Sequence, residues 1–304
     1  MMTEAETTVV ARTEEASADA PEVPMRGLVR PRPDPRPAEG RRPRVAGRFL
    51  FVEDEKLWVR GVTYGTFLPA APDDDGYDPV KVDADFAQMR AAGINAVRVY
   101  TVPPRWLLDV ALQHGLWVAV DIPWEEHITF LDQRGLPSKI RDRVMAQVRS
   151  CAGHPAVLAF SIGNEIPSRI VRWHGAHAVE SFLEALADAV HEADPGALVT
   201  YVNYPSTEYL RVRGLDYDSW NVYLEDDDDF ERYVARLQNL SPDRPSVIAE
   251  LGADSMRKGS EFQASLIETQ VRATFAAVSY THLRAHETND LISYAGFCLK
   301  KGGG

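Results

Sequence analysis

Cysteine is nearly absent from this sequence, which contains only Cys151 and Cys298 among its 304 residues. Two cysteines this far apart do not make the disulfide framework of a small secreted domain, and their spacing fits no metal site. Apolar runs long enough to span a membrane are also missing. We therefore predict no disulfide framework and no membrane segment in this chain, and we identify no metal or other cofactor.

A secretory signal is lacking as well, because Met1 is followed by acidic residues, Ala and Thr rather than by a basic segment and an apolar one. This absence predicts a cytoplasmic location for the chain as written. Residues 1–45 contain few large apolar side chains and many Pro, Arg, Glu and Ala. Such a segment buries too little surface to offset its ordering entropy, so we expect a disordered N-terminal arm.

Positive charge is in deficit. The formal net charge is −12, which argues against nucleic acid as a partner. Much of the excess comes from two acidic runs, at residues 73–75 and 225–229. A calcium loop would space its ligands with intervening residues and a glycine turn, so we interpret both runs as solvated loops.

What the sequence does contain is a regular alternation of strand-like and helix-like segments. Residues 49–59 predict a short β-hairpin around an acidic turn, and residues 60–64 predict the first strand after it. Further strands are expected at 94–100, 116–120, 156–162, 198–202, 217–223 and 246–250, and helices at 82–92, 105–114, 138–152, 178–193, 230–240 and 260–277. Gly115 is the expected C-cap of the second helix, and Ser138 is the expected N-cap of the third.

Seven strands, each followed by a predicted helix except the fifth, imply a parallel sheet. A doubly wound sheet usually carries a Gly-rich phosphate loop after its first strand, and none is present. We therefore predict an α/β fold of the (β/α)8 TIM-barrel type over residues 46–277, preceded by the β-hairpin and the disordered arm. The functional site of such a barrel lies at the carboxyl ends of its strands.

The chain after residue 277 departs from this pattern. Residues 278–288 are polar without a useful period, and residues 280–288 resemble a peptide that recurs in proteins translated from sequencing-adaptor read-through. We predict that residues 278–304 are a non-native tail and that the barrel is truncated after its seventh unit, with strand eight missing or replaced. Residues 291–299 are the run that can serve as the replacement; without it, the first and seventh strands have unpaired edges.

Two of the predicted strands end in a glutamate. Residues 160–165 and 247–250 are apolar runs of strand length that stop at Glu165 and at Glu250. A buried parallel strand carries Val, Ile, Leu and Phe on both faces and has no use for a carboxylate. A pair of carboxylates at the strand ends of a barrel is the arrangement that cleaves glycosidic bonds.

These features resemble the retaining glycoside hydrolases whose (β/α)8 barrels carry catalytic glutamates on strands four and seven, and most closely the catalytic barrel of family 2 β-glycosidases. The resemblance rests on residues 60–64, 95–100, 154–157, 163–165 and 249–252. It implies hydrolysis of O-glycosidic bonds with retention, in carbohydrate metabolism, with Glu165 as the acid/base and Glu250 as the nucleophile. Since Glu250 must be ionised, its charge would raise the pKa of a nearby Glu165.

The resemblance also implies the residues that support this pair. Arg98 would orient the nucleophile, Asn164 would contact the sugar 2-hydroxyl, and Tyr223 would touch the nucleophile. Arg98 lies within an apolar strand, where an unpaired guanidinium is costly, and a structural salt bridge is the alternative reading. The further substrate-binding or supporting candidates are Asn221, Trp124, His127, Tyr64 and Asn203. Trp124 either stacks on a sugar ring or anchors its loop, and a core role is equally open for Asn221.

The expected activity is β-glycosidase hydrolysis of an oligosaccharide or polysaccharide. A second hypothesis is a non-hydrolytic carbohydrate-binding or transglycosylase barrel within a larger polysaccharide-synthesis protein, such as one fused to a glycosyltransferase in a C-terminal domain that this chain lacks. A barrel lyase or aldolase is a weaker third reading, because the strand ends offer neither a Schiff-base lysine nor a set of metal ligands.

Overall fold

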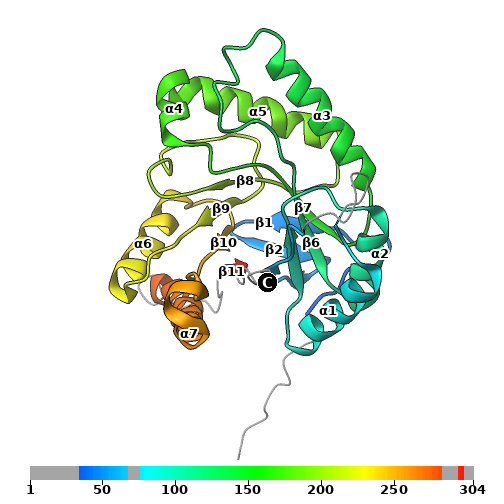
Figure 1. Cartoon of the computed structure of the whole chain (residues 1–304), viewed down its shortest axis with the longest axis vertical. Coiled ribbons are helices and arrows are strands. Elements are labelled where there is room, and N and C mark those ends of the chain that lie inside the picture. The colour runs from blue at the N-terminus through cyan, green and yellow to red at the C-terminus, as the bar shows by residue number, and fades with distance from the viewer. Residues whose placement is uncertain (1–33, 68–75, 283–293, 298–304) are drawn as a thin grey trace, which may run out of the picture. The chain divides into compact units, whose positions relative to one another are not determined.

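The alternating strands and helices of the sequence fold into a barrel in the computed structural model of the protein (Figure 1), which describes residues 34–67, 76–282 and 294–297. Eight parallel strands close the ring in the order β10-β11-β4-β5-β6-β7-β8-β9. Their bounds are β4 (Arg60–Thr63), β5 (Ala96–Val99), β6 (Trp117–Asp121), β7 (Val157–Asn164), β8 (Val199–Asn203), β9 (Asp218–Asn221), β10 (Ser246–Glu250) and β11 (Tyr294–Phe297). The predicted TIM-barrel class is confirmed.

The apolar runs of the sequence explain why these strands form the ring. Every residue of β5, β6 and β8 is buried, as expected for parallel strands that are covered on both faces. The helices on the outside, visible around the strands in Figure 1, are α1 (Pro79–Ala91), α2 (Arg105–His114), α3 (Leu136–Cys151), α4 (Ser168–His174), α5 (Ala176–Ala193), α6 (Asp227–Leu240) and α7 (Ser255–His282). The carboxyl ends of all strands therefore meet at one rim.

All the predicted helices except α2 begin two to five residues earlier than the sequence predicts. α3 begins at Leu136, so Ser138 lies inside the first turn and does not cap the helix. Pro137 explains the earlier start, because its fixed φ suits the first turn of a helix and it has no N–H to satisfy. α4 was not predicted, whereas α2 ends at His114 with Gly115 as its C-cap, as expected. None of the helices in the described part is long and apolar enough to cross a membrane.

A small antiparallel sheet precedes the barrel. It consists of β1 (Pro43–Ala46), β2 (Phe49–Val52) and β3 (Glu55–Lys56), paired in that order. β2 and β3 are the predicted hairpin, and β1 is an additional strand. Asn95 joins this region to the barrel, because its side chain accepts from the Arg60 amide at 2.7 Å and donates to the Trp58 carbonyl at 2.7 Å.

Ordered contacts in the N-terminal segment begin before the sheet. Asp34 forms an ion pair with Arg60, and Arg42 forms one with Asp194 at 2.9 Å. These contacts precede residue 45, the boundary that composition predicts for the disordered arm. The difference arises because charged pairs, which composition does not reveal, hold a segment with few apolar side chains. The arm before Asp34 lies outside the described residues.

The eighth strand of the ring is β11, which pairs in parallel with β10 and with β4. It lies within residues 291–299, the run named above as a replacement strand. Helix α7 likewise continues past residue 277 to His282. β11 thus fills the gap that would leave β10 and β4 with unpaired edges. The non-native origin of residues 278–304 stays a prediction.

Candidate active site

The two predicted glutamates lie on the same rim of the barrel. β7 ends at Asn164, directly before Glu165, and β10 ends at Glu250. Arg98 lies on β5, near the carboxyl end of that strand. Because the carboxyl ends of parallel strands meet at this rim, residues that are far apart in the sequence come together there.

Arg98 is the buried centre of this rim, with 2% of its side chain exposed. Its Nε and Nη2 donate to the two carboxylate oxygens of Asp121 at 3.1 and 2.5 Å, and its Nη1 donates to Oε1 of Glu250 at 2.7 Å. A guanidinium this deeply buried needs such partners, because an unpaired one would carry a large desolvation cost. The contact with the nucleophile candidate and the structural ion pair, which were alternatives from the sequence, therefore both occur.

Glu250 accepts hydrogen bonds from three side chains. Its Oε1 accepts from Arg98 at 2.7 Å and from the Tyr100 hydroxyl at 3.0 Å, and its Oε2 accepts from the Tyr223 hydroxyl. Burial and the charge of Glu250 raise the pKa of Tyr100, so this hydroxyl keeps its proton and remains a donor. Three donors suit an ionised carboxylate, which can only accept, and they fix its orientation.

Glu165 has a different environment. Its Oε1 accepts a hydrogen bond from Nδ2 of Asn221 at 2.7 Å. Burial is the largest cause that raises the pKa of Glu165 above its ordinary value; the charge of Glu250 adds to the rise, and the hydrogen bond from Asn221 opposes it. The expected influence of Glu250 therefore has the predicted sign, although burial has the larger effect.

A chain of hydrogen bonds connects the two glutamates. Oδ1 of Asn164 accepts from Arg98 Nη2 at 2.9 Å and from Asn221 Nδ2 at 3.2 Å. Arg98 in turn binds Glu250, and Asn221 binds Glu165. Asn221 is 1% exposed, so this connection runs through the buried layer beneath the rim. The two carboxyl groups belong to one polar cluster.

The sequence match to known families covers this cluster completely. The family model described as "Glycosyl hydrolases family 2, TIM barrel domain" matches residues 44–273. The chain belongs to glycosyl hydrolase family 2. The resemblance drawn from the strand-end motifs is thereby confirmed, while no curated protein matches the chain.

Solved structures of family 2 and related enzymes share the fold. A Bacteroides uniformis β-glucuronidase 2, covalently bound to cyclophellitol-6-carboxylate aziridine, matches with a TM-score of 0.67 at 17% identity, over 84% of this chain and 32% of that chain. An Eisenbergiella tayi family 2 β-galacturonidase bound to galacturonate matches with a TM-score of 0.67 at 17% identity, over 84% and 46%. A Ruminococcus gnavus β-glucuronidase in complex with D-glucuronic acid matches with a TM-score of 0.66 at 15% identity, over 86% and 47%. The match thus spans 32% to 47% of these longer proteins.

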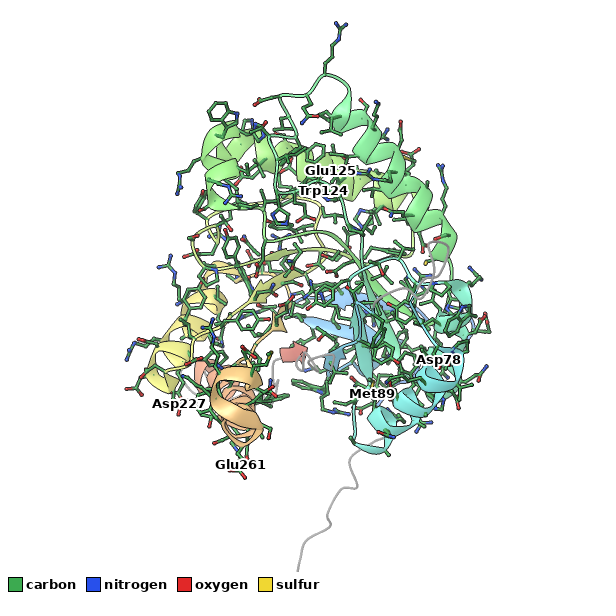
Figure 2. All side chains as sticks on the ribbon, in the orientation of Figure 1. Asp78, Met89, Trp124, Glu125, Asp227 and Glu261 are labelled. Atoms are coloured by element: carbon green, nitrogen blue, oxygen red, sulfur yellow. The ribbon has the colours of Figure 1, made fainter. Side chains whose placement is uncertain are left out.

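Trp124 of this family 2 barrel packs beside the rim as a loop anchor. Its indole N–H donates to the Ile162 carbonyl at 2.7 Å, and its ring meets those of Phe130 and Phe182 with centroid distances of 4.9 and 5.4 Å. It lies on the loop after β6, near α5 (Figure 2), with 9% of its surface exposed. These contacts agree with the second of the two hypotheses for Trp124, in which it anchors its loop rather than stacking on a sugar ring.

Tyr64 and Asn203 make contacts away from the glutamates. The Tyr64 hydroxyl donates to Asp85 of α1 at 2.9 Å. The Asn203 amide donates to the Thr207 carbonyl at 3.0 Å and accepts from the Thr207 hydroxyl at 2.6 Å. His127, by contrast, is exposed on the loop after β6, and its charge opposes the rise that burial causes in the pKa of Glu165. The structure therefore brings His127 near the cluster and places the other two in packing positions.

Three residues of the cluster were not named as site candidates from the sequence. Tyr100 lies two residues after Arg98, and Asp121 ends the apolar run of β6, so strand period and strand-end position could have found both. Glu126 is 6% exposed and binds the backbone of Asn164, but nothing distinguishes it in sequence from its neighbour Glu125. Within the residues that the structure describes, no group of three or more His, Cys, Asp or Glu is arranged to hold a metal ion.

Proposed function

We propose that this family 2 barrel is a retaining β-glycosidase, with Glu250 as the nucleophile and Glu165 as the general acid/base. The observation that carries the proposal is the contrast between two carboxyl groups in one cluster. Glu250 has three donors around it, which suits a charged nucleophile. Glu165 is half-buried, and burial raises its pKa, which is the direction that a general acid requires.

In the first step, a carboxylate oxygen of Glu250 forms a bond to the anomeric carbon of the sugar. The bond between that carbon and the glycosidic oxygen breaks, and its electron pair stays on the oxygen. That oxygen takes the proton of Glu165 and departs as an alcohol. The products of this step are a glycosyl ester on Glu250 and an ionised Glu165.

In the second step, the ionised Glu165 takes a proton from water while the water oxygen bonds to the anomeric carbon. The ester bond to Glu250 breaks, and its electron pair returns to the carboxylate. The configuration at the anomeric carbon is inverted twice and so is retained. Both glutamates recover their starting protonation states.

The buried cluster supports each step through position and charge. Arg98, Tyr100 and Tyr223 hold the Glu250 carboxylate in a fixed orientation by donors on both of its oxygens. Asn221 orients the Glu165 carboxyl from the other side of the network. Asn164 accepts hydrogen bonds from Arg98 and Asn221 at its Oδ1, and so fixes the side chain that binds Glu250 relative to the one that binds Glu165.

The substrate class we propose is a β-glycoside of a hexose or a hexuronic acid. The similar structures include β-glucuronidases and a β-galacturonidase, at 15–17% identity. A first panel therefore contains aryl β-glucuronides and β-galacturonides, with β-glucosides and β-galactosides beside them.

Covalent trapping tests the proposal. A 2-deoxy-2-fluoro sugar from this panel, carrying a dinitrophenyl leaving group, slows the second step more than the first, so the glycosyl ester accumulates. We expect the intact mass of the protein to rise by one fluoro-sugar and peptide mapping to place the label on Glu250. The Glu250→Gln variant is the control and acquires no label.

Two results would overturn the proposal. One is turnover of the natural-configuration glycoside with inversion, followed by NMR of the anomeric proton. The other is binding of these sugars without turnover or labelling, which supports the alternative of a non-hydrolytic carbohydrate-binding barrel. Transglycosylation would instead appear as retained products formed with an added alcohol or sugar acceptor.

A further inference from the structure

Glu126 is a buried carboxyl beside the acid/base candidate that the mechanism above does not use. It lies on the loop after β6 with 6% of its surface exposed, and its Oε2 accepts the backbone N–H of Asn164 at 2.8 Å. Building on the proposed function, we infer that Glu126 is a positioning residue for Glu165. By holding the Asn164 peptide, it sets the direction from which the Glu165 carboxyl meets the leaving group.

The geometry of the strand ends explains why this position needs a side-chain acceptor. The N–H of Glu165 donates to the Val202 carbonyl of β8 at 2.9 Å. Successive N–H groups of a strand point to opposite sides, so the N–H of Asn164 faces the side of β6. β6 ends at Asp121, and the acceptor of the Asn164 N–H is the Glu126 carboxyl rather than a carbonyl of that strand. The Glu126 carboxyl therefore serves as the acceptor that a neighbouring strand would otherwise provide with a backbone carbonyl.

The backbone at Glu165 depends on such anchors. Glu165 has a φ of 54°, in the left-handed region that costs energy for a residue with a side chain. The amides on either side are held, one by Glu126 and the other by the Tyr201 hydroxyl, which accepts from Ile166 N at 3.0 Å. Without the Glu126 anchor, the chain at this point can relax toward ordinary φ values, and the acid then points elsewhere.

The charges around Glu126 indicate which form of its carboxyl makes this contact. The groups that face it are Asp121 from β6, Arg98 from β5, Glu165 after β7 and Tyr201 from β8. Burial, with smaller contributions from the Asp121 and Glu165 charges, raises the pKa of Glu126 to about 8. Glu126 is therefore a neutral acid at neutral pH, and glutamine reproduces its size, its acceptor oxygen and its lack of charge.

Two substrates of the same sugar separate positioning of the acid from general damage. A phenyl glycoside has a poor leaving group that needs the proton of Glu165, whereas a 2,4-dinitrophenyl glycoside departs without it. We expect Glu126→Met to lose about 10- to 100-fold in kcat/KM on the phenyl glycoside and less than about 3-fold on the dinitrophenyl glycoside. Glu126→Gln should stay within about 3-fold of wild type on both.

Two further variants make the test secure. Glu125→Met removes the neighbouring carboxyl, which is partly exposed and pairs with Arg143. This variant should leave kcat/KM unchanged on both substrates. Glu126→Asp keeps a carboxyl group but shortens the side chain by one methylene. It replaces Glu126→Met in the test if that variant does not fold. We expect it to show a smaller loss that is again confined to the phenyl glycoside.

Equal losses on the two substrates in Glu126→Met or Glu126→Asp overturn the inference, as does wild-type activity in both. An equal loss in Glu126→Gln and Glu126→Met also overturns it, because the acceptor oxygen would then not be what matters. Glu165→Ala in the same assay tests the proposed function separately. If that variant shows no dependence on the leaving group, the acid/base assignment fails, whatever the Glu126 variants do.

Discussion

The Arg98 guanidinium on β5 donates from Nη1 to Oε1 of Glu250, at the end of β10, over 2.7 Å. Nε and Nη2 of the same group bind both oxygens of Asp121, at the end of β6, and Nη2 also binds Oδ1 of Asn164, at the end of β7. One buried cation thus fixes polar groups from three other strands. Most of what can be tested about this rim follows from that arrangement.

Replacing Arg98 by Met should destabilise the protein by about 3–5 kcal/mol, because it leaves the Asp121 carboxylate buried without its partner. Urea unfolding at neutral pH measures the change. Arg143→Met is the matched control, since it breaks an ion pair with Glu125 that is about 40% exposed on both sides and should cost less than about 1 kcal/mol. Similar losses in the two variants would show that Asp121 does not depend on Arg98.

Replacing Tyr223 by Phe should lower kcat by about 10- to 100-fold, because it removes a hydrogen bond to Glu250, the proposed nucleophile. The free energy of unfolding should change little, since Tyr223 is 51% exposed. Steady-state kinetics on the best aryl glycoside of the panel gives the answer. Tyr209→Phe, at a tyrosine that is 48% exposed, is the control. An equal loss of kcat in that variant would show that the Tyr223 hydroxyl has no specific effect on the reaction.

Replacing Asn221 by Ala should move the alkaline limb of the kcat/KM profile to higher pH. The limb reports loss of the Glu165 proton, and burial already raises that pKa. The hydrogen bond from Asn221 favours the ionised form and opposes the rise, so its removal raises the pKa of Glu165 further. A limb that stays in place or moves to lower pH contradicts this order of influences.

The stability difference between wild type and Glu126→Gln should depend on pH. The pKa of Glu126 is about 8 in the folded protein, against an ordinary value of 4.5. Between these values the folded state binds the extra proton, so the contribution of Glu126 is fully present below pH 4.5 and declines as pH rises through 8.

Glutamine does not titrate, so wild type should lose stability relative to Glu126→Gln between pH 5 and pH 9, by up to about 4 kcal/mol. Urea unfolding of both proteins at these two pH values measures it. A constant difference would mean that the Glu126 carboxyl titrates alike in the folded and unfolded chains.

The strands and the strand-end positions of Glu165 and Glu250 could be predicted from the sequence, because an apolar run that stops at a carboxylate is visible without coordinates. Arg98 was found for the same reason, as a charge inside such a run. Asp121 gives the same signal at the end of β6 and could have been found. Glu126 could not, because its role depends on how a loop returns to the backbone of β7.

Strand-end position alone was a poorer guide for Tyr64 and Asn203. The Tyr64 side chain forms its hydrogen bond with α1, and the Asn203 side chain forms its hydrogen bond with the loop after β8.

The left-handed backbone at Glu165 sets the stability of the fold against the proposed catalytic role at a single position. Glycine adopts a φ of 54° at little cost, whereas glutamate does so only under constraint. The Glu165→Gly variant, which the proposed mechanism predicts to be inactive, should therefore unfold at a higher temperature than the wild type. Such a catalytically silent, more robust form is the natural starting material for capturing an uncleaved sugar ligand.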